Sequence, residues 1–289
     1  MDALAYDLKQ LCSRNRNGSK STQANRLRIL SLVATQIADS GFKLDKARSL
    51  KPKHIGAVLE KWKADKLTTG TIKNRMAAIR WWAGSVNKTS ILQSNEDYGI
   101  EARANTKTDK SHKLNLDKLD AIECPKIKMA VRLQAAFGLR REEAIKFTPA
   151  AADKGKFIAL KASTTKGGRY REIAISTDRQ RQLLNEAKEL ANGASLIPAD
   201  KNYKQQLKAY ENQTLKAGLK NNHGLRHNYA QWRYQQLTGW KCPAKDGLKK
   251  TDMTTEQWQI DRQARADISE ELGHSRIDIT DVYLGSATQ

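Results

Sequence analysis

The hydrophobic positions in the first hundred residues recur every three or four residues, which is the period of an amphipathic α-helix. Four stretches show this pattern, and short polar breaks separate them. Ser21 and Thr22 offer a cap for the second stretch, Gly41 follows it, and Pro52 stands where a first helical turn favours proline. We therefore predict a bundle of four or five helices. Its apolar stripes are Leu4, Leu8 and Leu11; Leu27, Leu30, Ala34 and Ile37; Ile55, Val58, Leu59 and Trp62; and Ile72, Met76, Ile79, Ala83 and Val86.

The later part of the chain combines helical patterns with one β-prone region. Asn115 is a plausible cap for the run LDKLDAI, and the chain is predicted to continue into a helix that ends around AAFGLRREEAIKF. Two β-prone runs, 157–163 and 170–175, flank a Lys-Gly-Gly turn, which is typical of a hairpin. Helical patterns then return as far as residue 237. We predict a mainly α fold whose second domain carries a small β-hairpin.

Charge separates this chain from an ordinary soluble protein. Lys and Arg outnumber Asp and Glu by 52 to 31, a formal net charge of +21 over 289 residues. The hydrophobic fraction of 39% still suffices for folding, and the length suits two domains. So large a charge of one sign favours a polyanionic partner, with a merely soluble basic protein as the alternative.

The region between the first helical bundle and the later mixed pattern has no hydrophobic periodicity and almost no large apolar side chains. We predict an interdomain linker over 94–114, a first domain over 1–93 and a second over 115–289. Because its later half, KTDKSHK, is basic, we expect the linker to follow the DNA surface.

Cysteine usage and hydropathy limit the cellular compartments in which we expect the protein. Cys12, Cys124 and Cys242 are far apart and show no metal-ligand spacing, so we expect a reducing compartment and no structural metal. No window of about 18 apolar residues exists, and the N-terminus does not resemble a signal peptide. We expect a cytoplasmic, nucleoid-associated protein with no membrane partner.

Basic side chains occupy the polar faces of the first-domain helices, together with Trp81 and Trp82, which we expect to be exposed. A solvated basic face is the alternative for any one of them, but the net charge favours phosphate contact. The candidate DNA-binding residues are Lys20, Arg26, Arg28, Lys73, Arg75 and Arg80.

The stretch NNHGLRHNYA concentrates two of the five histidines around an arginine. On a helix, His223 and Arg226 point to one side. A guanidinium suits two oxygens of a phosphate, and an imidazole adds one directional donor that can also carry a proton. Taken alone, such a pair is more often a surface or capping feature.

Two other regions of the sequence make a functional role for His223 and Arg226 more plausible than this comparison suggests. Arg140 follows an apolar run and Gly138, so its charge is predicted to be partly buried and to need Glu143 or a bound phosphate. His274 and Tyr283 would lie on opposite faces of one continuous helix. The Gly-His-Ser break and the potential cap Thr280 instead permit two short helical pieces that bring them together.

Four motifs in this order, GLRREE, TKGG, HGLRH and LGHSRIDITDVYL, resemble the tyrosine recombinases, or phage-type integrases. The resemblance covers residues 115–285. The first hundred residues resemble that family's helical, SAM-like core-binding domain. The fold implied for the second domain is that of the DNA breaking-rejoining enzymes.

The resemblance implies phosphoryl transfer without metal or cofactor. Tyr283 would attack the scissile phosphate and stay joined to the 3′-phosphate, while Arg140, Arg226 and His274 bind the non-bridging oxygens. His223 would bind the phosphate or accept the tyrosine proton. The remaining assignments are Lys166 as the acid for the leaving oxygen, His227 as a support of the site, and Glu143 as a residue that orients an arginine or the backbone.

The family also implies the partners. These are double-stranded DNA, a dimer to tetramer of the chain on that DNA, and accessory DNA-bending proteins, in the integration or excision of a mobile element. Two alternatives remain: a type IB topoisomerase with the same chemistry, and a non-catalytic DNA-binding protein with the same fold. We expect His54 and His112 to be ordinary surface residues.

The chain departs from the family pattern twice. Arg226 and His274 are 48 positions apart, about twice the usual distance, and we assign the excess to a surface insertion over 237–259 that could touch DNA or a neighbouring subunit. Only six residues follow Tyr283, too few for the C-terminal helix that family members exchange. We expect either a truncated chain or an assembly that uses another contact.

Overall fold

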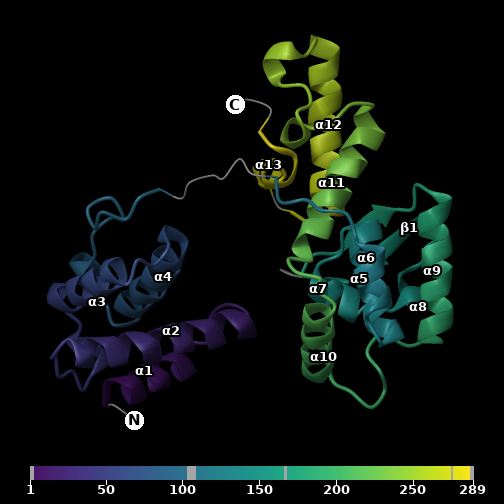
Figure 1. Cartoon of the computed structure of the whole chain (residues 1–289). Helices are drawn as coiled ribbons and strands as arrows, with labels where there is room; N and C mark the ends of the chain where they lie inside the picture. The colour runs from purple at the N-terminus through teal and green to yellow at the C-terminus, as the bar shows by residue number, and fades with distance from the viewer. Residues whose placement is uncertain (1–2, 103–108, 166–167, 275, 287–289) are drawn as a thin grey trace. The chain divides into compact units, whose positions relative to one another are not determined.

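The computed structural model describes residues 3–102, 109–165, 168–274 and 276–286. The chain divides into two compact units, residues 1–105 and 106–289. In the described segments, thirteen α-helices and one two-stranded sheet account for the regular structure (Figure 1). No helix among them is long and apolar enough to cross a membrane. The mainly α class predicted above is confirmed.

The first unit is a small helical bundle around its own core. Ser19 caps its second helix and Thr68 its fourth, each accepting a hydrogen bond from a backbone N–H three residues on. The cap of the second helix was therefore predicted two residues too late. The helices are α1 Ala3–Arg14, α2 Lys20–Asp39, α3 Pro52–Ala64 and α4 Thr69–Ser85, with the 3₁₀ turns η1 Ala47–Ser49 and η2 Thr89–Ile91.

Two side chains of this unit lie deeper than predicted. Trp82 is fully buried and its indole N–H donates to the carbonyl of Ala47 (2.9 Å), whereas Trp81 is only partly buried. His54 is also buried, and its Nδ1 accepts from the backbone N–H of Lys51 (3.1 Å). Both predictions of exposure were wrong because each polar atom finds a backbone partner inside the fold.

The second unit packs its helices around one continuous core (Figure 1). The helix α6 contacts α7, α9 and α11, and α11 in turn contacts α12 and α13. The elements are α5 Leu116–Asp120, α6 Pro125–Phe137, α7 Arg141–Ile145, α8 Pro149–Ala152, β1 Phe157–Leu160, η3 Ala162–Thr164, β2 Arg171–Ala174, α9 Asp178–Ala191, α10 Tyr203–Lys216, α11 His223–Thr238, η4 Pro243–Lys245, η5 Lys250–Asp252, α12 Thr255–Glu271, η6 Ile277–Ile279 and α13 Asp281–Leu284.

The hairpin is antiparallel as predicted, but its strands are shorter than the β-prone runs. Phe157 pairs with Ala174 and Leu160 with Arg171. Alternation along β2 buries Arg171 and Ile173 on the same side. An arginine therefore enters the interior from a strand.

The helical stretch predicted after Asn115 consists of three helices. Asn115 does cap α5, accepting from the N–H of Lys118 (2.8 Å). Pro125 begins α6, and Gly138 ends it in the left-handed conformation with φ of 60°. A Cβ on Gly138 would also lie 2.5 Å from the Tyr229 ring, so this break is fixed by both backbone and packing.

Candidate functional site

Arg226 is the buried centre of the site. It lies in the first turn of α11 and is 1% exposed. Its Nη1 donates to the carbonyl of Gly138 and its Nη2 to the carbonyl of Leu272, which are the C-terminal ends of α6 and α12. Two helix ends thus present partial negative charge to the guanidinium. Across the described ranges, no carboxylate forms an ion pair with it.

Burial, together with the nearby guanidinium groups of Arg140 and Arg171, lowers the pKa of Arg226 to about 10, while Tyr283 acts in the opposite direction. A cation in such surroundings is costly without an anion beside it. The arrangement is therefore suited to receive one.

Tyr283 lies beside this guanidinium. Its phenolic oxygen is 3.4 Å from Nε of Arg226 and 3.4 Å from Nε2 of His223, and the residue is 6% exposed. The carbonyl of Thr280 accepts from the N–H groups of both Tyr283 and Leu284, which starts the short helix α13. The Thr280 hydroxyl makes no capping bond, so the predicted cap acts through its backbone.

His274 completes the side of the site formed by α12. Its ring stacks on Tyr283 with centroids 5.2 Å apart, and its Nε2 lies 3.4 Å from Nη2 of Arg226. Burial, reinforced by the surrounding arginines, lowers the pKa of His274 to about 3. The imidazole is therefore neutral over the physiological range, when it can offer one N–H donor.

The two histidines of α11 have different surroundings. His223 is exposed and reaches the tyrosine oxygen, whereas His227 is buried with its ring centroid 4.4 Å from that of Tyr283. Burial and nearby cationic groups lower the pKa of His227 to about 4. His227 thus packs against the tyrosine ring, and His223 lies at the solvent side of its hydroxyl.

Glu143 holds two arginines at once. Its Oε1 accepts from Nη1 of Arg140 (3.0 Å) and from Nη1 of Arg171 (2.9 Å), and its Oε2 accepts from Nη2 of Arg171 and from the backbone N–H of Arg140. Burial alone would raise the pKa of Glu143, but these bonds and charges lower it to about 2. The carboxylate predicted as the partner of Arg140 is thus shared.

Arg171 was not singled out from the sequence. It is 5% exposed and packs against Gly273, where an added Cβ would lie 2.9 Å from its Cδ. The signal that could have identified it is the strand alternation, because Arg171 falls on the same face as Ile173.

Gly224 was also missed. The segment before α5 passes so close to it that an added Cβ would lie 2.3 Å from Cδ2 of His112 and 2.6 Å from the carbonyl oxygen of Lys110. His112 is half-buried, with Nε2 3.0 Å from the carbonyl oxygen of Asn221. It is therefore a packing residue at the start of α11 and not the surface residue predicted.

The remaining candidates are Lys166 and six residues of the first unit. Lys166 lies outside the described residues. In the first unit, Arg26 stacks over Trp81 at 4.1 Å and donates to Asn17 (2.7 Å), and Arg80 donates to the carbonyl of Gln93 (3.0 Å). The four others are exposed or half-exposed: Lys20, Arg28, Lys73 and Arg75.

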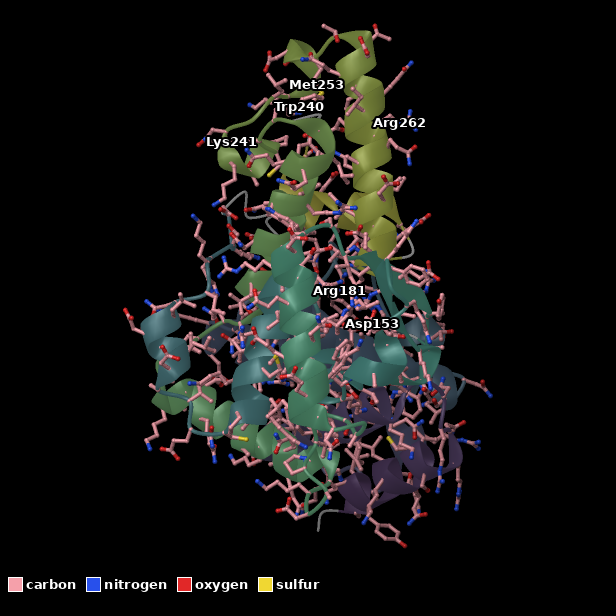
Figure 2. All side chains as sticks on the ribbon, turned by 90° about the vertical axis from the view of Figure 1, so that its right-hand side faces the viewer. Asp153, Arg181, Trp240, Lys241, Met253 and Arg262 are labelled. Carbon is pink, nitrogen blue, oxygen red and sulfur yellow. The ribbon has the colours of Figure 1, made fainter. Side chains whose placement is uncertain are left out.

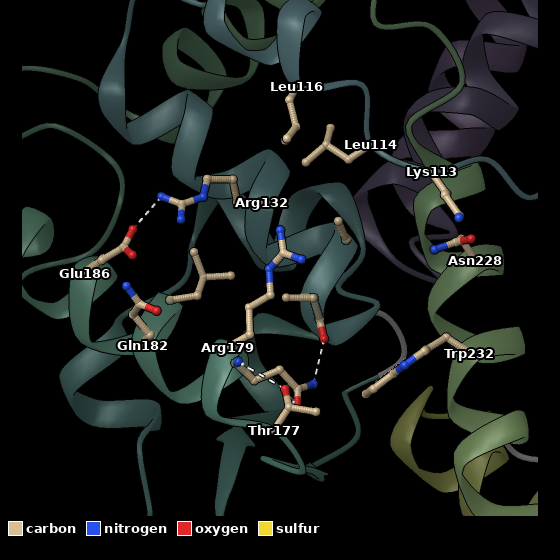
Figure 3. Close-up of a pocket in the computed structure, with 14 residues that line it drawn as sticks. Lys113, Leu114, Leu116, Arg132, Thr177, Arg179, Gln182, Glu186, Asn228 and Trp232 are labelled. Carbon is tan, nitrogen blue, oxygen red and sulfur yellow. Dashed lines mark hydrogen bonds and ion pairs between the residues drawn. The ribbon is translucent and has the colours of Figure 1, made fainter.

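A separate groove of about 560 Å³ lies between α6, α9 and α11 (Figure 3). Leu114, Leu183 and Trp232 supply apolar walls, and an ion pair of 2.6 Å between Arg132 and Glu186 closes one side. It contains none of the residues around the tyrosine. Within the described ranges, no group of three or more His, Cys, Asp or Glu side chains could hold a metal ion.

The clustered side chains thus offer two arginines, neutral imidazoles and a phenol around one point, which is a donor set for a phosphate. Two family models match the chain: "Phage integrase, N-terminal" over residues 1–89 and "Integrase" over residues 99–232. The chain belongs to the tyrosine recombinase family. The second match includes Arg140 and Arg226 but ends before His274 and Tyr283, both of which contact Arg226 in the structure.

Solved recombinase structures share the fold over nearly the whole chain. XerH site-specific recombinase bound to its difH substrate is 17% identical, with a TM-score of 0.58 over 96% of this chain and 81% of that one. A lambda integrase dimer bound to a COC′ core site is 15% identical, with a TM-score of 0.60 over 96% and 76%. The Tn1549 transposon integrase in complex with transposon right end DNA is 16% identical, with a TM-score of 0.55 over 100% and 96%. No curated protein sequence matches the chain.

Proposed function

We propose that this recombinase cleaves and rejoins DNA at specific sites through a covalent 3′-phosphotyrosine on Tyr283. The observation that carries the proposal is the buried Arg226 guanidinium, which has helix carbonyls behind it and the tyrosine hydroxyl in front. A buried cation without a carboxylate, next to a nucleophile, fits a phosphodiester better than it fits a structural role.

The residues divide the chemistry as follows. The oxygen of Tyr283 attacks the phosphorus, and its proton passes to His223, whose Nε2 lies 3.4 Å away on the solvent side. Arg226, Arg140 and His274 stabilise the non-bridging oxygens as negative charge develops on them.

The P–O5′ bond then breaks. We assign the proton for the 5′-oxygen to Lys166, and the free 5′-hydroxyl of the exchanged strand later attacks the phosphotyrosine to release Tyr283. The bond energy stays in the phosphotyrosine, so no nucleotide cofactor enters the balance.

We infer that the natural assembly is a dimer or tetramer on double-stranded DNA, and that accessory DNA-bending proteins assist it in moving a mobile element. Support comes from the fold shared with a lambda integrase dimer bound to a core site and with a transposon integrase bound to transposon end DNA. The basic face of the first unit, from Lys20 to Arg80, would bind the flanking phosphates.

The test uses nicked suicide substrates made from the DNA that flanks the gene. Wild-type protein should form an adduct that survives SDS, and Tyr283→Phe should form none while still binding the DNA. Persistence of the adduct in Tyr283→Phe would overturn the assignment. Relaxation of plasmids of arbitrary sequence by the monomer would instead identify a type IB topoisomerase.

A further inference from the structure

The connection between α11 and α12 contacts the segment that carries Tyr283. Residues 239–254 form this connection, since the first and last residues of the predicted insertion belong to the two helices. Figure 2 shows Trp240, Lys241 and Met253 together at the end of the α11–α12 pair, away from Asp153 and Arg181. Two chains of contacts lead from here to α13.

The first chain of contacts is a buried polar relay. The indole N–H of Trp240 donates to the hydroxyl of Tyr234 (3.1 Å), which donates to Asp261 (2.6 Å). Asp261 accepts from Nε of Arg265 (2.9 Å), and Nη1 of Arg265 donates to Asp281 (2.8 Å) in the first turn of α13. Asp261 is 0% and Arg265 4% exposed, so the middle of this relay is shielded from water, whereas the Asp281 side chain at its end is 40% exposed.

The second chain of contacts reaches the backbone of α13. Lys245 of η4 pairs with Asp109 (2.6 Å), which accepts from Nε2 of Gln231 (2.8 Å). The same amide nitrogen donates to the carbonyl of Tyr283 (3.0 Å).

The end of α13 is held as well. Nη1 of Arg265 donates to the carbonyl of Gly285 (3.0 Å). Gly285 also packs so close to η4 that an added Cβ would lie 2.7 Å from the backbone nitrogen of Ala244.

These contacts matter because α13 is only four residues long. A single helical turn does not hold its conformation in water, since nucleation costs more than one turn of hydrogen bonds returns. The position of the Tyr283 hydroxyl therefore depends on what α13 packs against. Within the same chain, α13 packs against Arg265 and against the turn η4.

We propose that the insertion and the Arg265–Asp281 pair form an intramolecular clasp that holds Tyr283 beside Arg226 in the same chain. Arg265, Asp281 and Lys245 are then positioning residues. The catalytic consequence rests on the proposed function, whereas the clasp itself is a property of the free protein.

The main test compares Asp281→Ala with the control Asp278→Ala, an exposed acidic residue three positions earlier whose ion pair is with Arg276. Hydrogen exchange should accelerate about tenfold in Asp281→Ala at the amides of Tyr283, Leu284 and Gly285, the effect of losing one charge-assisted hydrogen bond. The rate of covalent adduct formation should fall by a similar factor with unchanged DNA affinity. Asp281→Glu should restore part of both.

Lys245→Ala tests the insertion separately, because this half-exposed side chain can be removed without opening the core. It should accelerate exchange at the same amides by a smaller factor. Exchange in both variants equal to that of Asp278→Ala would overturn the clasp. If exchange behaves as expected but wild-type protein forms no adduct, the proposed function fails and the clasp stands.

Discussion

The Nε of Arg226 lies 3.4 Å from the phenolic oxygen of Tyr283, although the two residues are 57 positions apart in the chain. The guanidinium cannot turn away, because its other nitrogens are bound to the carbonyls of Gly138 and Leu272. The arginine is thus oriented before any DNA arrives, which is the condition for strong stabilisation of a transition state.

Replacing Arg226 with lysine should remove this orientation while keeping the charge. An ammonium group has no planar fork, so it cannot serve two helix ends and a phosphate together. We expect the single-turnover cleavage rate to fall about 10²- to 10³-fold. DNA affinity, measured by gel shift, should change little because many other phosphate contacts contribute. Arg141→Lys, at an exposed ion pair with Glu211, is the control, and equal rates in the two variants would contradict the role of Arg226.

Glu143→Gln should destabilise the protein, because it leaves Arg140 and Arg171 without their shared charge. Removing one partner of a buried ion pair costs about 3–5 kcal/mol in the free energy of unfolding. Its neighbour Glu142 pairs with Lys146 at the surface, so Glu142→Gln should change that free energy by less than about 0.5 kcal/mol. Urea unfolding of both variants provides the measurement. Equal stabilities would show that the shared carboxylate is not a structural centre of the site.

Gly224→Ala should displace the segment before α5. The new methyl group would overlap His112 and the carbonyl of Lys110, and relief of such overpacking costs about 1–3 kcal/mol. Gly56→Ala is the control, because nothing lies within 4 Å of its Cβ position and alanine favours a helix by up to about 1 kcal/mol. Thermal unfolding should move in opposite directions for the two variants. A Gly224→Ala protein as stable as wild type would contradict the close packing at α11.

Acid should weaken the folded state through two histidines. The pKa values of His227 and His274 are lowered to about 4 and about 3, chiefly by burial, whereas unfolded histidine titrates near 6.5. As pH falls below about 6.5, the unfolded chain binds protons that the folded chain does not, so stability decreases. We expect a loss of about 1 kcal/mol per histidine between pH 7 and 5, allowing for solvent screening.

The double variant His227→Gln/His274→Gln should lose less stability over the same pH range. Urea unfolding at pH 7, 6 and 5 measures the difference, and the comparison isolates the histidines because both proteins carry the same carboxylates. Equal slopes for wild type and variant would contradict the assignment of the acid sensitivity to these two rings.

Element types followed from local patterns. Pro52 begins a helix as predicted, and the hairpin forms where β-prone runs flank a glycine turn, because these preferences act over a few residues. The burial of individual side chains could not be predicted from these local patterns. Trp82 lies inside because its indole meets the carbonyl of Ala47, 35 positions away, and His54 because its ring packs against that of Phe42.

The sequence by itself determined the helical class, the net positive charge and the order of the arginine, histidine and tyrosine motifs that resemble a recombinase. Only the tertiary structure decided that Arg226 donates hydrogen bonds to carbonyls 88 and 46 positions away. It also decided that Arg171 and Arg140 share Glu143, and that the insertion contacts α13. The physical reason is that where a helix ends, or which face of a strand is apolar, depends on a few neighbouring residues. Which ends meet in the core is settled by packing across the whole unit.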